Sequence, residues 1–139
     1  MGHQDILRRA SFAHVCGDSI IAAIAGLALY ASFPPVGWWW LSVPALALFV
    51  SRIDEARAPR ALTVTFVFGM SFWVPLIDWI PLAVGTTPPW FVLALVQTFF
   101  FMGWVLFARW TQLWRWARGP LTQAFLFALT WAGVDAARS

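Results

Sequence analysis

The fold of this chain is decided by residues 19–50, which read SIIAAIAGLALYASFPPVGWWWLSVPALALFV. The stretch holds no charged residue, yet it cannot form one helix, because Pro34 and Pro35 stand in its middle. Proline lacks an amide hydrogen, fixes φ and pushes the preceding residue out of the helical region. The stretch therefore predicts a hairpin of two helices, at about 12–33 and 36–50. The second helix is short, so a re-entrant hairpin stays open, although two tilted membrane spans are favoured.

The arginines occur in clusters that separate the apolar blocks of the chain. All nine cations are arginine, and eight of them lie in three clusters, at 8–9, 52–60 and 109–118. The two connections between these clusters, at 34–37 and 84–89, carry no charge. Lysine and arginine are retained on the cytoplasmic side of a membrane. The pattern predicts a multi-pass protein of the bacterial cell (inner) membrane, with the N-terminus and the arginine clusters in the cytoplasm and the uncharged connections outside.

The composition supports a membrane protein independently. The chain is 61% hydrophobic and 11% charged, whereas an ordinary soluble domain is about 25% charged. Too few polar residues remain to cover a large soluble core. The basic residues separate apolar blocks instead of gathering on one face, so no nucleic acid is expected as a partner. Many of the eleven tryptophans flank apolar blocks, as in an interfacial belt; these are Trp38, Trp39, Trp40, Trp90, Trp110, Trp114 and Trp116.

Three further apolar blocks follow the hairpin. The block at 61–83 is interrupted by Pro75, Asp78 and Pro81, and the block at 90–108 is free of charge over about one bilayer thickness. The last block, at 121–138, has about 14 apolar residues before Asp135, which is too few for a complete span. We therefore predict an all-α, polytopic membrane protein with about five transmembrane helices, the last one incomplete, in a single domain over residues 1–139.

Few residues suggest a metal or cofactor site. Cys16 is the single cysteine, which excludes an internal disulfide and a cysteine-cluster metal site. His14, Cys16 and Asp18 alternate along the sequence, but on a helix the side chains of residues i and i+2 point about 200° apart and cannot meet at one ion. Gly69 and Gly103 lie inside apolar blocks and are expected to allow close helix packing. No metal and no cofactor are predicted.

The acidic residues are the candidates for function. Asp78 adjoins an apolar span, and such an acid is a functional candidate by default; Trp79 beside it suits the outer interface. The alternative is that Asp78 only ends a helix among lipid headgroups, and this alternative is favoured. The same alternative is favoured for Asp18, which lies near the cytoplasmic end. Asp54 and Glu55 lie between Arg52 and Arg57 and are expected to form a solvated loop of cancelling charges.

Four segments, taken in order, resemble bacterial apolipoprotein N-acyltransferases. Residues 29–40, LYASFPPVGWWW, resemble the Phe-Pro-x-x-Gly-x-Trp link between the first two helices of that family. Residues 66–73, FVFGMSFW, resemble its third helix, which is followed by an outward tryptophan (here Trp79), and residues 88–90, PPW, resemble the start of its fourth. Residues 129–138, LTWAGVDAAR, are similar to a Leu-Trp-x-x-x-Glu-x-x-Arg stretch, with Asp135 in place of glutamate and Arg138 as the arginine. The details are closest to actinobacterial members.

The resemblance implies a function. Members of the family transfer an acyl chain from a phospholipid to the amino group of the lipidated N-terminal cysteine of lipoproteins. A Glu, a Lys and a Cys in an extracytoplasmic carbon–nitrogen hydrolase domain perform this reaction. The chain is expected to stop before that domain and to be inactive alone, without a catalytic residue of its own. Pro81 stands where many members have a tyrosine, so a substrate contact by that tyrosine does not carry over.

Two other classes of function stay open. In actinobacteria a membrane domain of this type can accompany a polyprenol-phosphate mannose synthase, so the chain could be a membrane anchor for that enzyme. It could also be an unrelated small transporter or integral membrane subunit. A hydrolase-like reading frame directly downstream would indicate an acyltransferase, whereas an adjacent glycosyltransferase gene would indicate the anchor.

Overall fold

The computed structural model describes residues 3–54 and 56–110, together with six isolated helical positions at 122, 125, 129, 132, 133 and 136. The helices, in chain order, are α1 (His3–Ala31), the 3-10 turn η1 (Trp39–Leu41), α2 (Ser42–Asp54), α3 (Ala58–Leu76), α4 (Ile80–Val84) and α5 (Pro88–Trp110). Within these described ranges there is no strand. The all-α prediction is confirmed for this part of the chain.

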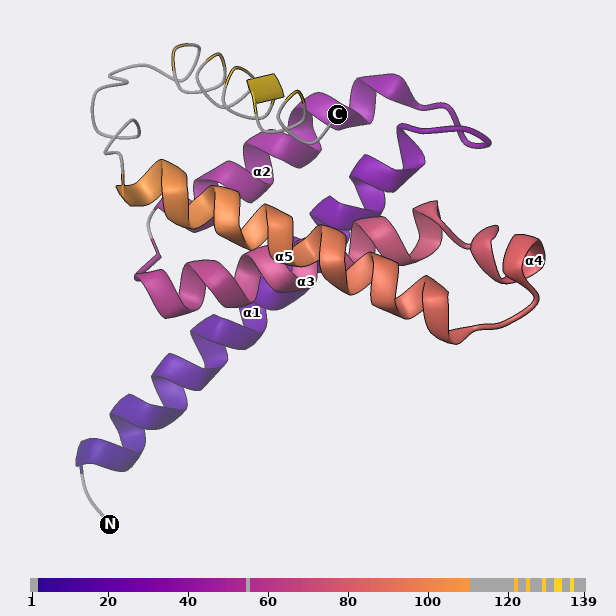
Figure 1. Cartoon of the computed structure of the whole chain (residues 1–139). Coiled ribbons are helices and arrows are strands. Elements are labelled where there is room, and N and C mark those ends of the chain that lie inside the picture. The colour runs from indigo at the N-terminus through magenta and orange to yellow at the C-terminus, as the bar shows by residue number, and fades with distance from the viewer. Residues whose placement is uncertain are drawn as a thin grey trace.

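The four long helices lie beside one another, and successive ones run in roughly opposite directions (Figure 1). Helix α3 packs against both α1 and α5, and α2 packs against α1 and α3. The connection at 32–38 and the short helix α4 lie at one end of the bundle, on the right of the view. The α2–α3 connection and the C-terminal end of α5 lie at the opposite end. The two kinds of connection that the sequence distinguishes by charge are therefore separated in space.

The proline pair breaks the first apolar stretch as the sequence predicts. Helix α1 ends at Ala31, the Pro34–Pro35 peptide bond is cis, and Gly37 has a φ of 71°. This left-handed conformation strains any residue with a Cβ, which explains the glycine. Helix α2 starts only at Ser42, with Pro44 in its first turn, where a missing amide hydrogen costs nothing. With 13 residues, α2 is about 20 Å long, shorter than a hydrocarbon core of about 30 Å.

The stretch at 61–83, expected as one helix, forms two. Helix α3 ends at Leu76, a three-residue turn follows, and α4 starts at Ile80. Pro75 is accommodated inside α3, but Pro81 comes only six residues later and has no amide hydrogen to donate to the Ile77 carbonyl, so it disfavours a continuation of α3. In the first turn of a new helix an amide hydrogen has no partner within that helix, so its absence from Pro81 costs nothing in α4. The indole of Trp90, at the start of α5, donates a hydrogen bond of 2.9 Å to the Val74 carbonyl near the end of α3.

The core combines stacked aromatic rings with close backbone contacts. Phe49 of α2 stacks on Phe68 of α3, with ring centroids 4.1 Å apart. A Cβ added at Gly26 of α1 would lie 2.6 Å from the Phe68 carbonyl oxygen, and one at Gly69 would lie 2.8 Å from a side-chain carbon of Thr98. The packing role predicted for Gly69 is thus confirmed. The same prediction is wrong for Gly103, because an added Cβ would meet no atom within 4 Å.

The outer surface of the bundle is apolar. Exposed large side chains follow each other at helical spacing on α1 and on α5; they include Ile20, Ile24 and Leu27, and Val92, Val96 and Phe99. The segments Ala13–Ala31 and Pro88–Trp110 are long and apolar enough to cross a membrane. Exposed apolar surface of this extent is typical of a face that meets lipid or another protein. These features support a location in a membrane.

Candidate functional site

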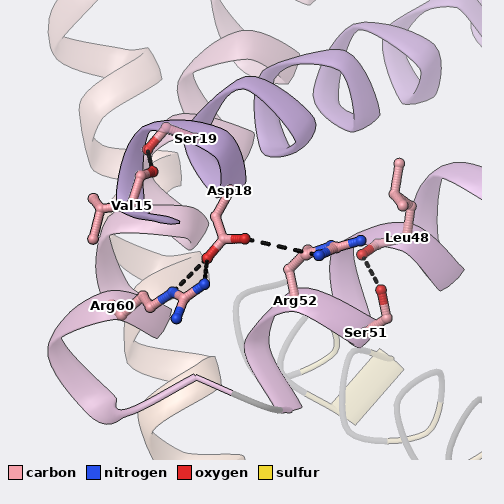
Figure 2. A network of polar contacts seen from close by, with 7 residues as sticks. All are labelled: Val15, Asp18, Ser19, Leu48, Ser51, Arg52 and Arg60. Carbon is pink, nitrogen blue, oxygen red and sulfur yellow. Dashed lines mark hydrogen bonds and ion pairs between the residues drawn. The ribbon is translucent and has the colours of Figure 1, made fainter. Parts of the chain in front are cut away.

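A cluster of charged side chains joins three helices at the arginine-rich end of the bundle, and we call it the Asp18 cluster. Asp18 of α1 is only 5% exposed. Its Oδ2 accepts a hydrogen bond from Nε of Arg60 and forms an ion pair with Nη2 of the same residue, while Nη1 of Arg52 lies 3.8 Å from Oδ1 (Figure 2). Both arginine side chains are a little over one third exposed. The cluster comprises Asp18, Arg52 and Arg60.

The helix dipole acts in opposite ways on the two arginines. Arg52 lies in the last turn of α2, where the partial negative charge of the helix end favours a cation. Arg60 lies in the first turn of α3, where the helix dipole disfavours a cation. The carboxylate of Asp18 compensates for this second placement. Asp18 therefore holds α1 against the start of α3 and also neutralises a cation that the α3 dipole would otherwise disfavour.

Arg109 links α5 to the connection between α2 and α3 through two hydrogen bonds. Its Nη1 donates to the Ile53 carbonyl and its Nη2 donates to the Ala56 carbonyl, both at 2.9 Å. Carbonyls at and just beyond the end of a helix have no partner within that helix, and a guanidinium can satisfy two of them at once. Arginines from two of the clusters seen in the sequence thus gather around one connection, between α2 and α3.

The sequence interpretation missed this arrangement. It expected the charges at 52–57 to cancel within a solvated loop, whereas Arg52 and Arg60 reach Asp18 on α1. The interpretation of Asp18 as a mere helix end is incomplete for the same reason. One signal could have revealed the contact: Asp18 is the only charged residue between Arg9 and Arg52. An acid within an otherwise apolar helix needs a cationic partner.

The candidates proposed from the sequence lie elsewhere. Asp78 is exposed in the turn between α3 and α4, and Trp79, at the N-cap of α4, is 59% exposed. This turn lies at the opposite end of the bundle from the α2–α3 connection (Figure 1), which Arg52 and Arg60 of the Asp18 cluster flank. Asp135 and Arg138 lie outside the described residues. The structure therefore does not bring Asp78 and Trp79 together with the Asp18 cluster.

The described side chains form charge pairs and helix caps. In the part of the chain that the structure describes, no group of three His, Cys, Asp or Glu residues could hold a metal ion. Cys16 is exposed on α1, and its helical position points it away from Asp18. A nucleophile needs an adjacent base to activate it, whereas the carboxylate of Asp18 is engaged by two arginines. This geometry fits helix positioning better than covalent catalysis.

Comparison with known proteins identifies the family. Residues 25–139 match the family described as the apolipoprotein N-acyltransferase N-terminal domain. A relative named apolipoprotein N-acyltransferase, from Mycolicibacterium smegmatis (strain ATCC 700084 / mc(2)155), is 38% identical over 87 residues, which are 61% of this chain and 14% of that protein.

No solved structure matches the chain. The chain spans 14% of the length of the Mycolicibacterium relative. Asp18 precedes the matched residues 25–139, whereas Arg52 and Arg60 lie within them. The resemblance found in the sequence is confirmed: this chain belongs to the family of the apolipoprotein N-acyltransferase N-terminal domain.

Proposed function

We propose that this chain is the membrane-embedded part of an apolipoprotein N-acyltransferase. Such an enzyme transfers an acyl chain from a phospholipid to the N-terminal diacylglyceryl-cysteine of a lipoprotein. The observation that carries the proposal is the family match over residues 25–139, and the apolar helices α1 and α5 support it. The phospholipid and the lipoprotein are the proposed partners.

In this proposal the chain crosses the inner membrane several times, with its N-terminus in the cytoplasm. Arg52, Arg60 and Arg109 lie around one connection of the bundle, and cations are retained on the cytoplasmic side. The uncharged connections lie at the other end (Figure 1). Helices α1 and α2 form a hairpin around the proline pair, with α2 as a short, tilted span; the last predicted span, at 121–138, lies largely outside the described residues.

The helices have a supporting role in the reaction. The charge pairs and caps of the Asp18 cluster and Arg109 fix the cytoplasmic end of the bundle. The family resemblance assigns the covalent step to a carbon–nitrogen hydrolase domain on the outer side of the membrane. The helices would anchor that domain at the membrane surface, within reach of the phospholipid, because catalysis requires the acyl donor and the nucleophile to be positioned together.

A chimera tests this role. The segment of the Mycolicibacterium relative that aligns with this chain is replaced by the chain's own 87 aligned residues, and the chimera is expressed in cells depleted of their own acyltransferase. We expect triacylated lipoprotein to reappear, as measured by mass spectrometry of the lipoprotein N-terminus. The matched control carries an unrelated apolar hairpin in the same place. A chimera that reaches the membrane in normal amounts but does not acylate would contradict the proposed role.

A further inference from the structure

Helix α4 is a short helix held in place at the uncharged end of the bundle. Ile80 is buried in a cluster with Ile77 and with Ala94 of α5. The helix ends at Gly85, whose φ of 78° is left-handed and whose amide donates to the Pro81 carbonyl at 2.9 Å. Five residues span only about 8 Å. The helix is therefore anchored on one side and cannot cross a bilayer.

The other side of α4 is apolar and uncovered. Leu82 is 88% exposed and Val84 is 57% exposed, next to the exposed Trp79. Across the two connections at this end, residues 32–38 and 77–87, Asp78 is the only charged residue. A helix that faced water would bear polar residues on such a side. The exposed side chains of α4 require an apolar or interfacial environment.

The apolar surface of α4 continues into that of the long helices. Phe91 and Val92, in the first turns of α5, are exposed as well, and they belong to the exposed apolar surface of that helix. The connection at 32–38 ends in Trp38, whose ring stacks on Trp40 with centroids 6.4 Å apart, and both rings are exposed. Tryptophan collects at the level of the lipid headgroups. The same end of the bundle therefore carries exposed aliphatic side chains next to exposed tryptophans.

We propose that α4 lies in the headgroup region of the bilayer, with Leu82 and Val84 entering the lipid, and that it is not part of an aqueous loop. The occupant of this surface is the lipid itself. Thr86 and Thr87, which are exposed and polar, mark the point where the chain returns to water. The inference rests on the membrane location of the chain and does not depend on its acyltransferase function.

The test uses a fluorescent probe at two positions four residues apart. Cys16 is replaced by Ser, and Leu82→Cys or Thr86→Cys is introduced and labelled with a polarity-sensitive dye. The whole chain is then reconstituted in phosphatidylcholine–phosphatidylglycerol vesicles. Both positions are exposed in the structure, so the two labels perturb the packing equally little. We expect spin-labelled lipid to quench the probe at position 82 several-fold more strongly than the probe at position 86. Aqueous iodide should show the reverse, with several-fold stronger quenching at position 86.

Two results would overturn the proposal. Equal quenching by iodide at both positions, without quenching by spin-labelled lipid, would place α4 in water. Protection of position 82 from both quenchers would mean that protein covers the helix. As a second measurement that needs no dye, an impermeant thiol reagent applied to vesicles with this end outward should modify the cysteine at position 86 and spare the one at position 82. Equal modification would contradict the inference even if a labelled variant folded poorly.

Discussion

At the scale of single residues, charge placement within the apolar bundle matters most. Asp18 is buried, and its two arginine partners remain partly exposed. Exposed ion pairs contribute about 0–1 kcal/mol, whereas removing one member of a fully buried pair costs about 3–5 kcal/mol. The Asp18 cluster lies between these limits, because solvent screens the arginines but not the carboxylate.

We predict that Asp18→Asn lowers the stability of the chain in detergent micelles by about 1–2 kcal/mol. The loss arises because Arg60 would remain without its carboxylate at the start of α3. Thermal unfolding followed by circular dichroism measures it, with Asp54→Asn, at an exposed acid, as the matched control. The exchange Asp18→Arg with Arg60→Asp should restore part of the loss. Equal unfolding temperatures for Asp18→Asn and Asp54→Asn would refute the role of the cluster.

Asp78 is predicted to be dispensable. It is exposed in the turn between α3 and α4, so we expect water and headgroups to solvate its carboxylate. Asp78→Asn in the chimera should therefore change neither its abundance in the membrane nor the amount of triacylated lipoprotein. Quantitative immunoblotting and mass spectrometry measure the two quantities. A marked loss of acylation at unchanged abundance would instead assign Asp78 a functional role.

At the scale of helices, glycine decides how closely α1 approaches α3. An added Cβ at Gly26 would lie 2.6 Å from a backbone oxygen of Phe68, which cannot rotate away, whereas at Gly103 the space is open. Overpacking of a close contact costs about 1–3 kcal/mol. Glycine in an open helical position instead destabilises a helix by about 0.5–1 kcal/mol relative to alanine.

The two glycines thus predict opposite effects of the same substitution. Gly26→Ala should lower the unfolding temperature of the chain in micelles, because α1 and α3 must separate. Gly103→Ala should leave it unchanged or raise it, because the new methyl group meets no atom within 4 Å. Differential scanning calorimetry on the two variants compares them directly. A destabilising Gly103→Ala together with a neutral Gly26→Ala would contradict the close contact of α1 with α3 at Gly26 and the open space at Gly103.

The helices differ in how far the sequence predicts them. The break at Pro34–Pro35 follows from proline chemistry alone. The close helix contact at Gly69 is predictable from a small residue inside an apolar block. The division of the 61–83 block into α3 and α4 could have been read from Pro81, but the apolar composition around it concealed the boundary. The contact of Asp18 with Arg60 joins residues 42 positions apart. A lone acid in an apolar stretch signals that a cationic partner is needed, but only the folded arrangement of α1 and α3 reveals that Arg60 is that partner.

At the scale of the whole molecule, the two ends of the bundle have different chemistry. The α2–α3 connection contacts Arg109 through two carbonyls, and Arg52 and Arg60 flank it. The opposite end carries exposed tryptophans and the apolar surface of α4. This separation is the polarity expected of a protein that crosses a membrane with its cations on the cytoplasmic side.

The orientation is testable by thiol labelling in intact cells, in a chain with Cys16→Ser. Ala56 lies in the arginine-rich connection but is buried, so Asp54, which is exposed, is the better position for a cysteine. Thr86→Cys should react with an impermeant reagent added outside, and Asp54→Cys should react only after the cells are permeabilised. Labelling of position 54 but not of position 86 in intact cells would reverse the proposed topology.

We propose that these helices support acyl transfer but do not perform it. The most direct measurement is the mass of a lipoprotein N-terminus from acyltransferase-depleted cells that express the 139 residues alone, with the chimera as positive control. Cys16 is the single cysteine of these residues and lies exposed on α1, near the arginine-rich end. We predict diacylated lipoprotein with the 139 residues alone, and triacylated lipoprotein with the chimera. Triacylation by the 139 residues alone, lost on Cys16→Ser, would contradict the account.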